Sequence, residues 1–368
     1  MNPQDTEGLT TVSASRTVYD IVYIGNYTKD TIVSPAGESH VDGGGAHYAA
    51  VAGARLGLSV AAVTRLSLED HRVVQILEQA GVKVFAHYTP QSTCVRLEYP
   101  TRDVDVREMY VTAYAGPISV KDIGAVDARA AVLGPSIRGE TGLEVIEDLR
   151  RRGMLVAADL QGFIRILRGT HVEHAPWPEK EAALALLDIV KVDAVEASYL
   201  TGEADPRAAC EHLASMGPKE IVLTRKNGLL VFDRGACHEA PFRPARMNGR
   251  SGRGDTCLGS YVAMRMTETP AVAMLWAAAV TSLKMEAQGH FDRTRGDVEQ
   301  LLRNAYGYDA TGGATKPDRQ AAPAGRRGLP RPVERADDRV AGRQSSGRGL
   351  AAVFRQLPAP HPGRSLGH

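Results

Sequence analysis

Residues 249–259 read Gly-Arg-Ser-Gly-Arg-Gly-Asp-Thr-Cys-Leu-Gly, and an apolar run follows them. The three glycines, Gly249, Gly252 and Gly254, allow the backbone N–H groups to approach an anion closely. The helix that the following run predicts would direct the positive end of its dipole toward the same point. The stretch therefore predicts an anion-binding loop that leads into a helix.

Asp255 stands directly after this loop, in the first turn of the predicted helix. Phosphate repels a carboxylate, so an acidic residue beside an anion site needs a function, and removing a proton from an attacking hydroxyl is one. The structural alternative is that Asp255 only caps its helix. The sequence contains neither Gly-x-x-x-x-Gly-Lys-Ser/Thr nor Gly-x-Gly-x-x-Gly between a strand and a helix, the two common nucleotide-binding patterns.

The composition is that of a globular protein with an uneven charge. Of 368 residues, 43% are apolar, which is enough for one large core or two modest ones. The net charge is +1, but residues 311–368 carry 11 Lys and Arg against 4 Asp and Glu, so the rest of the chain is acidic. An acidic body argues against binding to nucleic acid or to an anionic membrane surface.

The cysteine pattern and the hydropathy indicate a cytoplasmic protein. The four cysteines are far apart and form no Cys-x-x-Cys pair, so we expect reduced thiols and no zinc or redox motif. The residues through Ser15 are polar, without a cationic start and an apolar stretch, and no run of about 18 apolar residues occurs. We therefore expect neither export nor membrane insertion.

Strands and helices alternate along most of the chain. An apolar strand over 17–25 precedes a glycine turn, a helix over 46–56 and a strand over 60–64. Further apolar runs alternate with helical stretches: strands at 131–133, 155–158, 189–192 and 221–223, with helices at 141–152 and 206–216. This order predicts an α/β fold with a doubly wound, mostly parallel sheet flanked by helices, whose ligands bind at the carboxyl ends of the strands.

Residues 83–113 have a different pattern. Their apolar and polar positions alternate, which favours antiparallel strands with one face in water. We expect these strands, joined by residues 31–41, to form a small sheet that covers a cleft as a lid. Exposed edge strands of such a lid could pair in a homodimer.

Both ends of the chain are predicted to lie outside the folded domain, which we assign to residues 17–310. Residues 1–16 are predicted to be disordered. After a final helix over 295–305, residues 311–368 consist mostly of Arg, Ala, Pro and Gly without hydrophobic periodicity, so they are predicted to be disordered as well.

The motifs resemble those of the ribokinase-like (PfkB) family of carbohydrate and nucleoside kinases, over about residues 17–305. Gly252-Arg253-Gly254-Asp255-Thr256 is similar to the family signature Gly-Ala-Gly-Asp-Thr/Ser, with Arg253 in place of alanine. The resemblance implies that the backbone of Gly252, Arg253 and Gly254 forms an anion hole for the transferred phosphate. It also implies that Asp255 deprotonates the acceptor hydroxyl.

Other motifs resemble the donor side of the family. Asp193-Ala-Val-Glu196 is similar to its Asn-x-x-Glu motif, which implies that Asp193 and Glu196 organise Mg²⁺ and the nucleotide phosphates, with Glu196 closest to the metal. The segment from Thr224 to Gly228 resembles the nucleotide-side strand and turn, with Lys226 in place of a glycine. Residues 271–286 resemble the helix that lines the adenine pocket, with Lys284 near it.

The acceptor side resembles the family in its glycines. Gly43-Gly44-Gly45 opens a stretch similar to Gly-Gly-x-x-x-Asn-x-Ala, in which Tyr48 stands where Asn is common. The resemblance implies that this backbone approaches a sugar-like substrate and that Asp30, with Asn26, binds its hydroxyls. For the glycines the structural alternative is a closely packed helix, and for Asp30 it is a loop cap.

Together the motifs predict an enzyme that transfers a phosphoryl group from ATP, with Mg²⁺, to a hydroxyl of a small sugar or cyclic polyol. Two alternatives stay open: a nucleoside kinase, and a non-catalytic nucleotide- or sugar-binding sensor of the same fold. The predicted partner is the small-molecule substrate, with neither nucleic acid nor membrane.

Overall fold

The structure is a computed structural model that describes residues 17–101, 107–309 and 313–314, all within one compact unit. Its main sheet has nine strands among these residues. The strands from β13 to β5 run parallel, and β14 and β15 extend the sheet in the antiparallel direction. Their order is β15 (Ala236–Pro241), β14 (Gly228–Asp233), β13 (Glu220–Arg225), β12 (Ile189–Asp193), β9 (Leu155–Asp159), β8 (Asp127–Leu133), β1 (Val18–Ile24), β4 (Val60–Ser67) and β5 (Val82–Thr89).

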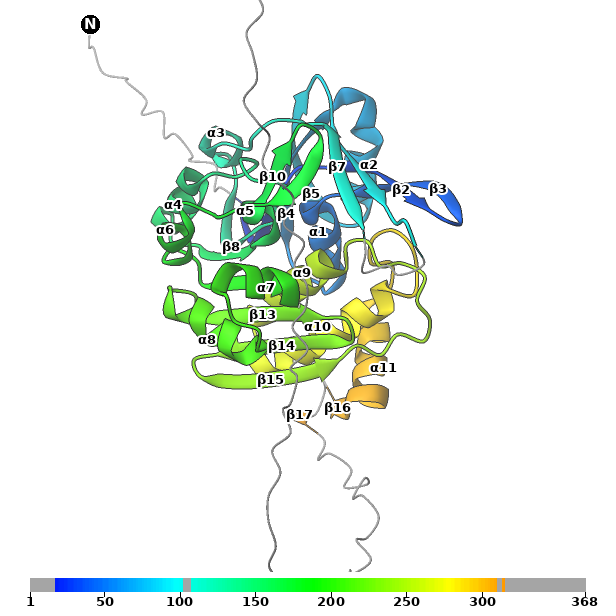
Figure 1. The fold of residues 1–368 in the computed structure, drawn as a ribbon. Helices are drawn as coiled ribbons and strands as arrows, with labels where there is room; N and C mark the ends of the chain where they lie inside the picture. Colours follow the sequence, from blue (N-terminus) through cyan, green and yellow to red (C-terminus); the bar gives the residue numbers. More distant parts are fainter. Residues whose placement is uncertain (1–16, 102–106, 310–312, 315–368) are drawn as a thin grey trace, which may run out of the picture. The chain divides into compact units, whose positions relative to one another are not determined.

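Helices cover both faces of this sheet (Figure 1). Alternate residues of β1 serve the two sides, because Ile21 and Tyr23 belong to one core and Val22 and Ile24 to the other. One core is covered by α1 (Gly45–Arg55), α2 (His71–Gln79), α9 (Arg253–Arg265), α10 (Pro270–Lys284) and α11 (Arg295–Tyr306), and the other by α3 (Val120–Ile123), α4 (Leu143–Arg151), α6 (Lys180–Leu184), α7 (Ala194–Thr201) and α8 (Pro206–Ser215). The predicted doubly wound, mostly parallel α/β fold is confirmed.

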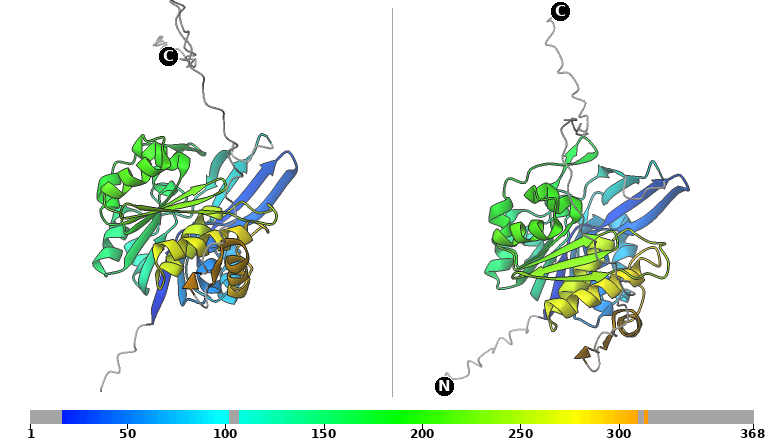
Figure 2. Two further views of the ribbon diagram at one scale, coloured as in Figure 1. Left: turned by 90° about the horizontal axis from the view of Figure 1, so that it is seen from below. Right: turned by 60° about the horizontal axis from the view of Figure 1, so that its bottom comes forward.

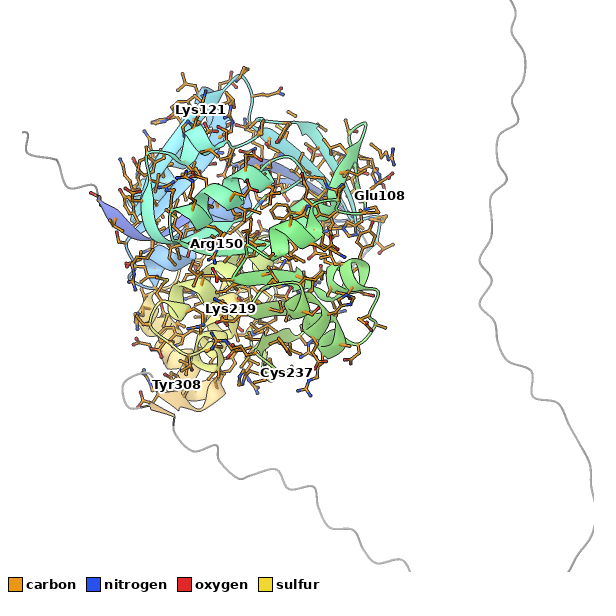
Figure 3. The ribbon with its side chains drawn as sticks, turned by 90° about the vertical axis from the view of Figure 1, so that its left-hand side faces the viewer. Glu108, Lys121, Arg150, Lys219, Cys237 and Tyr308 are labelled. Carbon is orange, nitrogen blue, oxygen red and sulfur yellow. The ribbon has the colours of Figure 1, made fainter. Side chains whose placement is uncertain are left out.

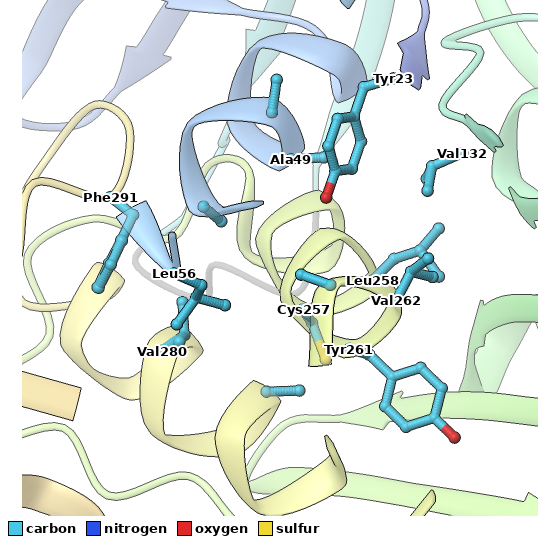
Figure 4. Close-up of a cluster of buried hydrophobic side chains, with 14 of the residues drawn as sticks. Tyr23, Ala49, Leu56, Val132, Cys257, Leu258, Tyr261, Val262, Val280 and Phe291 are labelled. Carbon is cyan, nitrogen blue, oxygen red and sulfur yellow. The ribbon is translucent and has the colours of Figure 1, made fainter. Parts of the chain in front are cut away.

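The packing of α1 against α9 determines where the glycine-rich loop before α9 lies. Tyr23 donates a hydrogen bond from its hydroxyl to the Gly259 carbonyl at 3.0 Å, and its ring lies between the two helices (Figure 4). A Cβ atom on Gly259 would lie 2.6 Å from Cα of Ala49, so only glycine permits this approach. The N-terminus of α9 is therefore held close to the N-terminus of α1.

On the opposite side, one carboxylate joins several elements. Asp188, before β12, accepts hydrogen bonds from Arg150 of α4 at 2.6 Å and from Lys219, before β13, at 3.2 Å. Figure 3 shows Arg150 and Lys219 on the same side of the molecule. Asp188 also accepts from the N–H of Val156 at 3.1 Å, so it fixes α4 against the ends of three strands.

A second sheet stands beside the main one (Figure 2). Its hairpin of β2 and β3 confirms that residues 31–41 belong to a small sheet. Its six described strands have the order β10 (Arg165–Arg168), β11 (His171–His174), β7 (Glu108–Ala113), β6 (Thr93–Glu98), β2 (Thr28–Ser34) and β3 (Gly37–Gly43). The strands β10 and β11, which follow the short helix α5 (Gln161–Ile164), were not predicted.

The prediction that residues 83–89 belong to this small sheet was wrong. They form β5, which pairs in parallel with β4 over Val60–Ser67 and is an edge strand of the main sheet. Val82 and Val84 point into the core while their neighbours are more exposed. An edge strand produces the same alternation of apolar and polar residues as a lid strand, so the pattern alone did not distinguish them.

The predicted disordered ends lie mostly outside the described residues, which exclude 1–16 and 315–368. At residues 313–314, inside the predicted tail, β17 (Gly313–Ala314) pairs with β16 (Tyr308–Asp309) after α11. A 3-10 turn, η1 (Leu68–Asp70), joins β4 to α2.

Candidate active site

A cleft of about 1270 Å³ lies between the small sheet and the carboxyl ends of the main-sheet strands. This is the edge at which open parallel sheets bind ligands. The small sheet contributes side chains such as Ile32, Met109 and Arg165. The strand ends and the segment around the start of α9 contribute charged and polar ones: Gln161, Lys191, Asp193, Glu196, Thr224, Arg225, Lys226, Arg250, Arg253 and Asp255.

The glycine loop enters this cleft as the sequence predicts. Gly252 is the N-cap of α9 and has φ +73°, a left-handed conformation that favours glycine. A Cβ atom on Gly252 would lie 2.3 Å from the Tyr48 ring, and one on Gly254 would lie 2.7 Å from Nζ of Lys191. Arg253 is the first residue of α9 and lines the cleft. The backbone of the first turn of α9 thus faces a buried lysine.

Asp255 follows in the same turn. Its side chain is half-buried, and its Oδ1 atom is buried without a hydrogen-bond partner among the described residues. Burial raises the pKa of Asp255, and the nearby cations Lys191 and Arg165 oppose the increase. A carboxylate with a raised pKa and an unpaired oxygen is suited to accept a proton. The N-cap of α9 is Gly252, so Asp255 is not the N-cap residue of its helix.

The predicted acceptor residues meet Asp255 at the start of α1. Gly44 is the N-cap of α1, with φ +102°, and a Cβ atom on it would lie 2.3 Å from the carbonyl oxygen of Asn26. A Cβ atom on Gly43 would lie 2.4 Å from Oδ2 of Asp30, and one on Gly45 would lie 3.0 Å from Oδ1 of Asp255. The structure therefore brings the two predicted residue groups to one place, although of these residues only Asp255 is among those that line the cleft.

Three backbones form the floor at this point. A Cβ atom on Gly25, after β1, would lie 2.7 Å from the carbonyl oxygen of Gly134, after β8, and one on Gly45 would lie 2.6 Å from the same oxygen. Gly134 also donates its N–H to the carbonyl of Ile24 at 2.9 Å. Side chains cannot be added at any of the three positions without moving the backbone of another.

Asn26 and Asp30 each present an unsatisfied acceptor. Oδ1 of both residues is buried without a hydrogen-bond partner among the described residues. The Asn26 amide donates to the carbonyl of Gly116 at 2.9 Å, which fixes its orientation. Burial and the nearby charge of Asp255 raise the pKa of Asp30 to about 6. Buried acceptors without partners cost free energy, so this arrangement suits a ligand that brings hydroxyl donors.

On the other side of the cleft, Asp193 and Glu196 form a capping box at the start of α7. Asp193 Oδ1 accepts from the N–H of Glu196, and Glu196 Oε2 accepts from the N–H of Asp193, both at 2.8 Å. Glu196 is buried, and its Oε1 accepts from Arg165 of β10 at 3.3 Å. Asp193 and Glu196 therefore cap α7, and Glu196 is in addition buried rather than solvated.

A buried ion pair lies between these two groups. Lys191 Nζ is 2.9 Å from Oδ2 of Asp159 and 4.0 Å from Oε2 of Glu196. Burial alone would lower the pKa of Lys191, but Asp159, Glu196 and Asp193 together raise it above its usual value. Lys191 therefore keeps its positive charge, directly beside the first turn of α9.

The last two predicted residues differ in position. Thr224 is buried at the carboxyl end of β13, lines the cleft, and donates its hydroxyl to the Val192 carbonyl at 3.4 Å. Gly228 lies opposite Arg225 in the β13–β14 hairpin and is absent from the described lining of the cleft. A Cβ atom on Gly228 would lie 2.4 Å from the Ala240 carbonyl, so strand packing explains this glycine.

Within the described segments, no group of three or more His, Cys, Asp or Glu side chains is arranged to hold a metal ion. Mg²⁺ usually keeps several waters and is held by one or two carboxylates together with substrate phosphates, so it does not need such a group. Asp193 and Glu196 lie at the cleft and have the right chemistry for contacts through water. The residues present fit a Mg²⁺ ion that arrives with a phosphate donor.

Sequence reasoning missed Lys191, Arg165 and Glu140. Lys191 carries a signal, because it is a charged residue inside an otherwise apolar strand. Glu140 is fully buried, accepts the N–H groups of Asn26 at 2.6 Å and Ser136 at 2.9 Å, and its pKa is raised to about 7 by burial. Its partner is 114 positions away, so no local pattern could identify it.

Solved structures of ribokinase-family kinases share this architecture. The chain is 34% identical to a pyrophosphate-dependent kinase in the ribokinase family, solved as a sulfate complex, with a TM-score of 0.71 over 76% of this chain and 99% of the other. The chain belongs to the ribokinase family of kinases. No protein-family model matches the chain. The family resemblance read from the motifs is confirmed.

Other ribokinase-family proteins are also similar to this chain. A pyrophosphate-dependent kinase complexed with a pyrophosphate analog and myo-inositol is 33% identical, with a TM-score of 0.71 over 76% of this chain and 99% of the other. The cytidine kinase of Thermococcus kodakarensis is 28% identical over 66% of this chain and 87% of its own length. Arabidopsis thaliana ribokinase, complexed with ribose and ATP, is 18% identical, with a TM-score of 0.63 over 78% of this chain and 99% of the other, and shares the fold.

No helix in the described part of this ribokinase-family chain combines the length and the apolar character needed to cross a membrane.

Proposed function

We propose that this kinase transfers a phosphoryl group to a hydroxyl of a small sugar or cyclic polyol, with Asp255 as the general base. One observation carries the proposal: the unpaired Oδ1 of Asp255 lies between the N-terminus of α9 and the glycines that adjoin Asp30. A hydroxyl group bound there could donate its proton to Asp255. The anion site and the hydroxyl site would thus meet at a carboxylate that can serve as the base.

In the proposed reaction, the acceptor oxygen attacks the terminal phosphorus of the donor as its proton passes to Asp255, and the bond from phosphorus to the leaving phosphate oxygen breaks. The N–H groups of Gly252 and Gly254 and the ammonium of Lys191 stabilise the negative charge on the transferred group. The Arg253 N–H donates instead to the Arg250 carbonyl at 3.1 Å. Mg²⁺, when bound near Glu196, would neutralise part of the donor's charge.

For the donor we favour pyrophosphate over ATP. The donor side of the cleft carries the cations Arg225, Lys226 and Arg250 in addition to Lys191 and Arg165. A small polyanion matches this density of charge better than a nucleoside does. The relatives at 33–34% identity are pyrophosphate-dependent, which supports the same choice.

For the acceptor we favour a cyclic polyol over a nucleoside. Asn26 and Asp30 offer two buried acceptors, which several adjacent hydroxyls would satisfy. The small sheet contributes apolar side chains, including Ile32 and Met109, among polar ones in the cleft lining, and these could pack against the C–H face of a ring. The similar kinase solved with myo-inositol supports this class.

The experiment is turnover of the purified chain with Mg²⁺, using pyrophosphate or ATP as the donor and inositols, pentoses, hexoses and cytidine as acceptors. We expect formation of a phosphorylated polyol, with release of phosphate from pyrophosphate or of ADP from ATP, and the greatest turnover with pyrophosphate. Asp255→Asn should lower kcat by a factor of at least about 10². Asp205→Asn is the matched control, because it makes the same change at the N-terminus of α8, far from the cleft, where Asn caps as well as Asp.

Three results would change the proposal. Preference for ATP would replace the donor but keep the reaction, and preference for cytidine would replace the acceptor class. Donor binding without turnover on any acceptor would favour a non-catalytic sensor. Full activity in Asp255→Asn would remove the base assignment.

A further inference from the structure

The second buried lysine of the molecule lies outside the cleft. Lys284, the last residue of α10, is 1% exposed. Its ammonium donates a hydrogen bond to the carbonyl of Gly249 at 3.0 Å and lies 5.4 Å from the centre of the Tyr48 ring. Within the described residues no carboxylate forms an ion pair with it. One hydrogen bond and one aromatic ring therefore hold this charge in the interior.

Such a charge is costly to bury, and an apolar side chain of similar length would fill the same space without that cost. Burial lowers the pKa of Lys284 to about 8, and Asp255 and Asp292 oppose the decrease. The titratable groups that face it are Tyr48 from α1, Asp255 from α9, and His290 and Asp292 after α10. At neutral pH the ammonium form predominates.

The contacts of Lys284 reach both ends of the glycine loop. At one end, the N–H groups of Asn248 and Gly249 both donate to the Met285 carbonyl at 2.9 Å. A Cβ atom on Gly249 would lie 1.8 Å from the Ala287 carbonyl oxygen, so this residue has no room to shift toward α10. The orientation of the Gly249 carbonyl toward Lys284 is therefore fixed by its surroundings.

At the other end, the ring of Tyr48 packs against Gly252, whose Cβ position would be 2.3 Å from the ring. The Tyr48 hydroxyl donates to the carbonyl of Asp42 at 3.0 Å, so the ring cannot move freely. The ammonium of Lys284 thus holds Gly249 directly and Gly252 through the face of an aromatic ring, a favourable cation–π arrangement.

We propose that Lys284 is a positioning residue for phosphoryl transfer. Its ammonium holds the Gly249–Gly254 loop in the conformation that binds anions and places a fixed positive charge behind it. The inference rests on the proposed function, since it assigns a role in the same site. It also gives Tyr48 a function, as the surface that transmits the position of the ammonium to Gly252.

The physical reason for a cation at this position is the charge of Asp255. A polyanion that approaches the loop is repelled by this carboxylate, and the neighbouring Lys191 is already paired with Asp159. A second positive charge, screened from water, offsets the repulsion without occupying the cleft. Because it is buried, the charge does not need to be reoriented when the donor arrives.

The test compares Lys284→Met and Lys284→Ala with wild type, and uses Lys121→Met, an exposed lysine of α3, as the matched control. We expect kcat of Lys284→Met to fall about tenfold or more, with the acceptor KM within about twofold of wild type. The melting temperature should not fall, because a buried charge is removed. In Lys284→Ala, ammonium or methylammonium ions should restore part of kcat, and tetramethylammonium at equal ionic strength should not.

Unchanged kcat in Lys284→Met would overturn the inference and leave the proposed function intact. A loss of kcat with a lower melting temperature and without amine rescue would overturn it as well, in favour of a structural role. Absence of turnover in wild type would instead overturn the proposed function. In that case calorimetric titration with pyrophosphate still tests the loop, because equal affinity in wild type and Lys284→Met would contradict its positioning by Lys284.

Discussion

Asp30 shows how a single residue can link binding, stability and pH. Its pKa is raised to about 6, first by burial and also by the charge of Asp255, so at neutral pH the site holds two nearby carboxylates. An unfolded Asp titrates near 4. The folded state therefore binds a proton more tightly than the unfolded state, and its stability falls as the pH rises from about 4 to 6.

We expect Asp30→Asn to raise the free energy of unfolding at pH 7 by on the order of 1–3 kcal/mol, because the carboxylate that resists ionisation is gone. The gain should vanish below about pH 4, where both states of wild type are protonated. Urea unfolding at about pH 3.5 and about pH 7, on either side of the titration, measures both values. The same variant should raise the acceptor KM about tenfold or more, since a charged hydrogen-bond acceptor is lost. An equal effect on stability at both pH values would contradict the assignment.

For Lys191 we expect the opposite effect of substitution on the free energy of unfolding. Lys191→Met leaves Asp159 and Glu196 buried without their cation, so we expect a loss of about 3–5 kcal/mol of stability together with a large loss of kcat. In the double variant Lys191→Met/Asp159→Asn, part of the stability should return while kcat stays low. Thermal unfolding and steady-state kinetics of the three proteins separate the two roles. Recovery of kcat in the double variant would show that Lys191 acts only through the fold.

At this scale the sequence located the residues with strong local signals and missed those defined by distant contacts. Asp255 and Gly252 stand in a glycine-rich loop and were found where they were expected. Glu140 and Arg165 meet their partners only after the chain has folded. For Gly228 a structural reason is also present, because a Cβ atom there would contact the Ala240 carbonyl of β15.

At the scale of elements, the N-terminus of α7 lies on the donor side of the cleft. Its capping box uses Asp193, and Asn would cap the helix equally well. The extra negative charge of Asp193 beside a donor site is therefore separable from its capping role.

Two substitutions make this separation. We expect Asp193→Asn to leave the melting temperature unchanged and to lower the KM for the phosphate donor, because a like charge is removed. Asp193→Ala should cost about 1 kcal/mol of stability through the lost cap. Thermal unfolding and donor titrations of both variants measure these effects. A higher donor KM in Asp193→Asn would instead support a direct role of this carboxylate in holding Mg²⁺.

The bounds of the elements were predicted closely wherever the apolar pattern was clear along the whole element. The predicted helix at 206–216 is observed as Pro206–Ser215, and the predicted strand at 189–192 as Ile189–Asp193. The assignment of β5 was wrong and β10–β11 was missed, because short strands take their sheet from long-range pairing. Local sequence carries little information about that pairing.

At the scale of the whole molecule, the order of the motifs predicted the fold, since each one falls at the same edge of the parallel sheet. The identity of the acceptor was less accessible, because the cleft is completed by the small sheet, where β10 and β11 join β7. The two sheets contribute different walls to one site.

A ligand that contacts both walls should therefore stabilise the entire described unit. We expect differential scanning calorimetry to show one cooperative transition that moves to higher temperature with polyol, with a gain of about 2.7 kcal/mol at 100 times Kd. Asp30→Asn should reduce this shift at the same polyol concentration, while Asp205→Asn should not. Two separate transitions, of which only one responds to the polyol, would show that the sheets unfold independently.

The close packing of Gly25, Gly45 and Gly134 limits how the substrate specificity of such an enzyme can change during evolution. These three backbones touch one another beneath the acceptor residues, so a substitution at any one of them displaces its neighbours rather than reshaping the floor. Descendants that accept larger or differently shaped molecules must therefore vary the opposite wall, where side chains of the small sheet can be exchanged singly. Changes in substrate specificity would therefore arise from substitutions in the small sheet, while Gly25, Gly45 and Gly134 stay glycine.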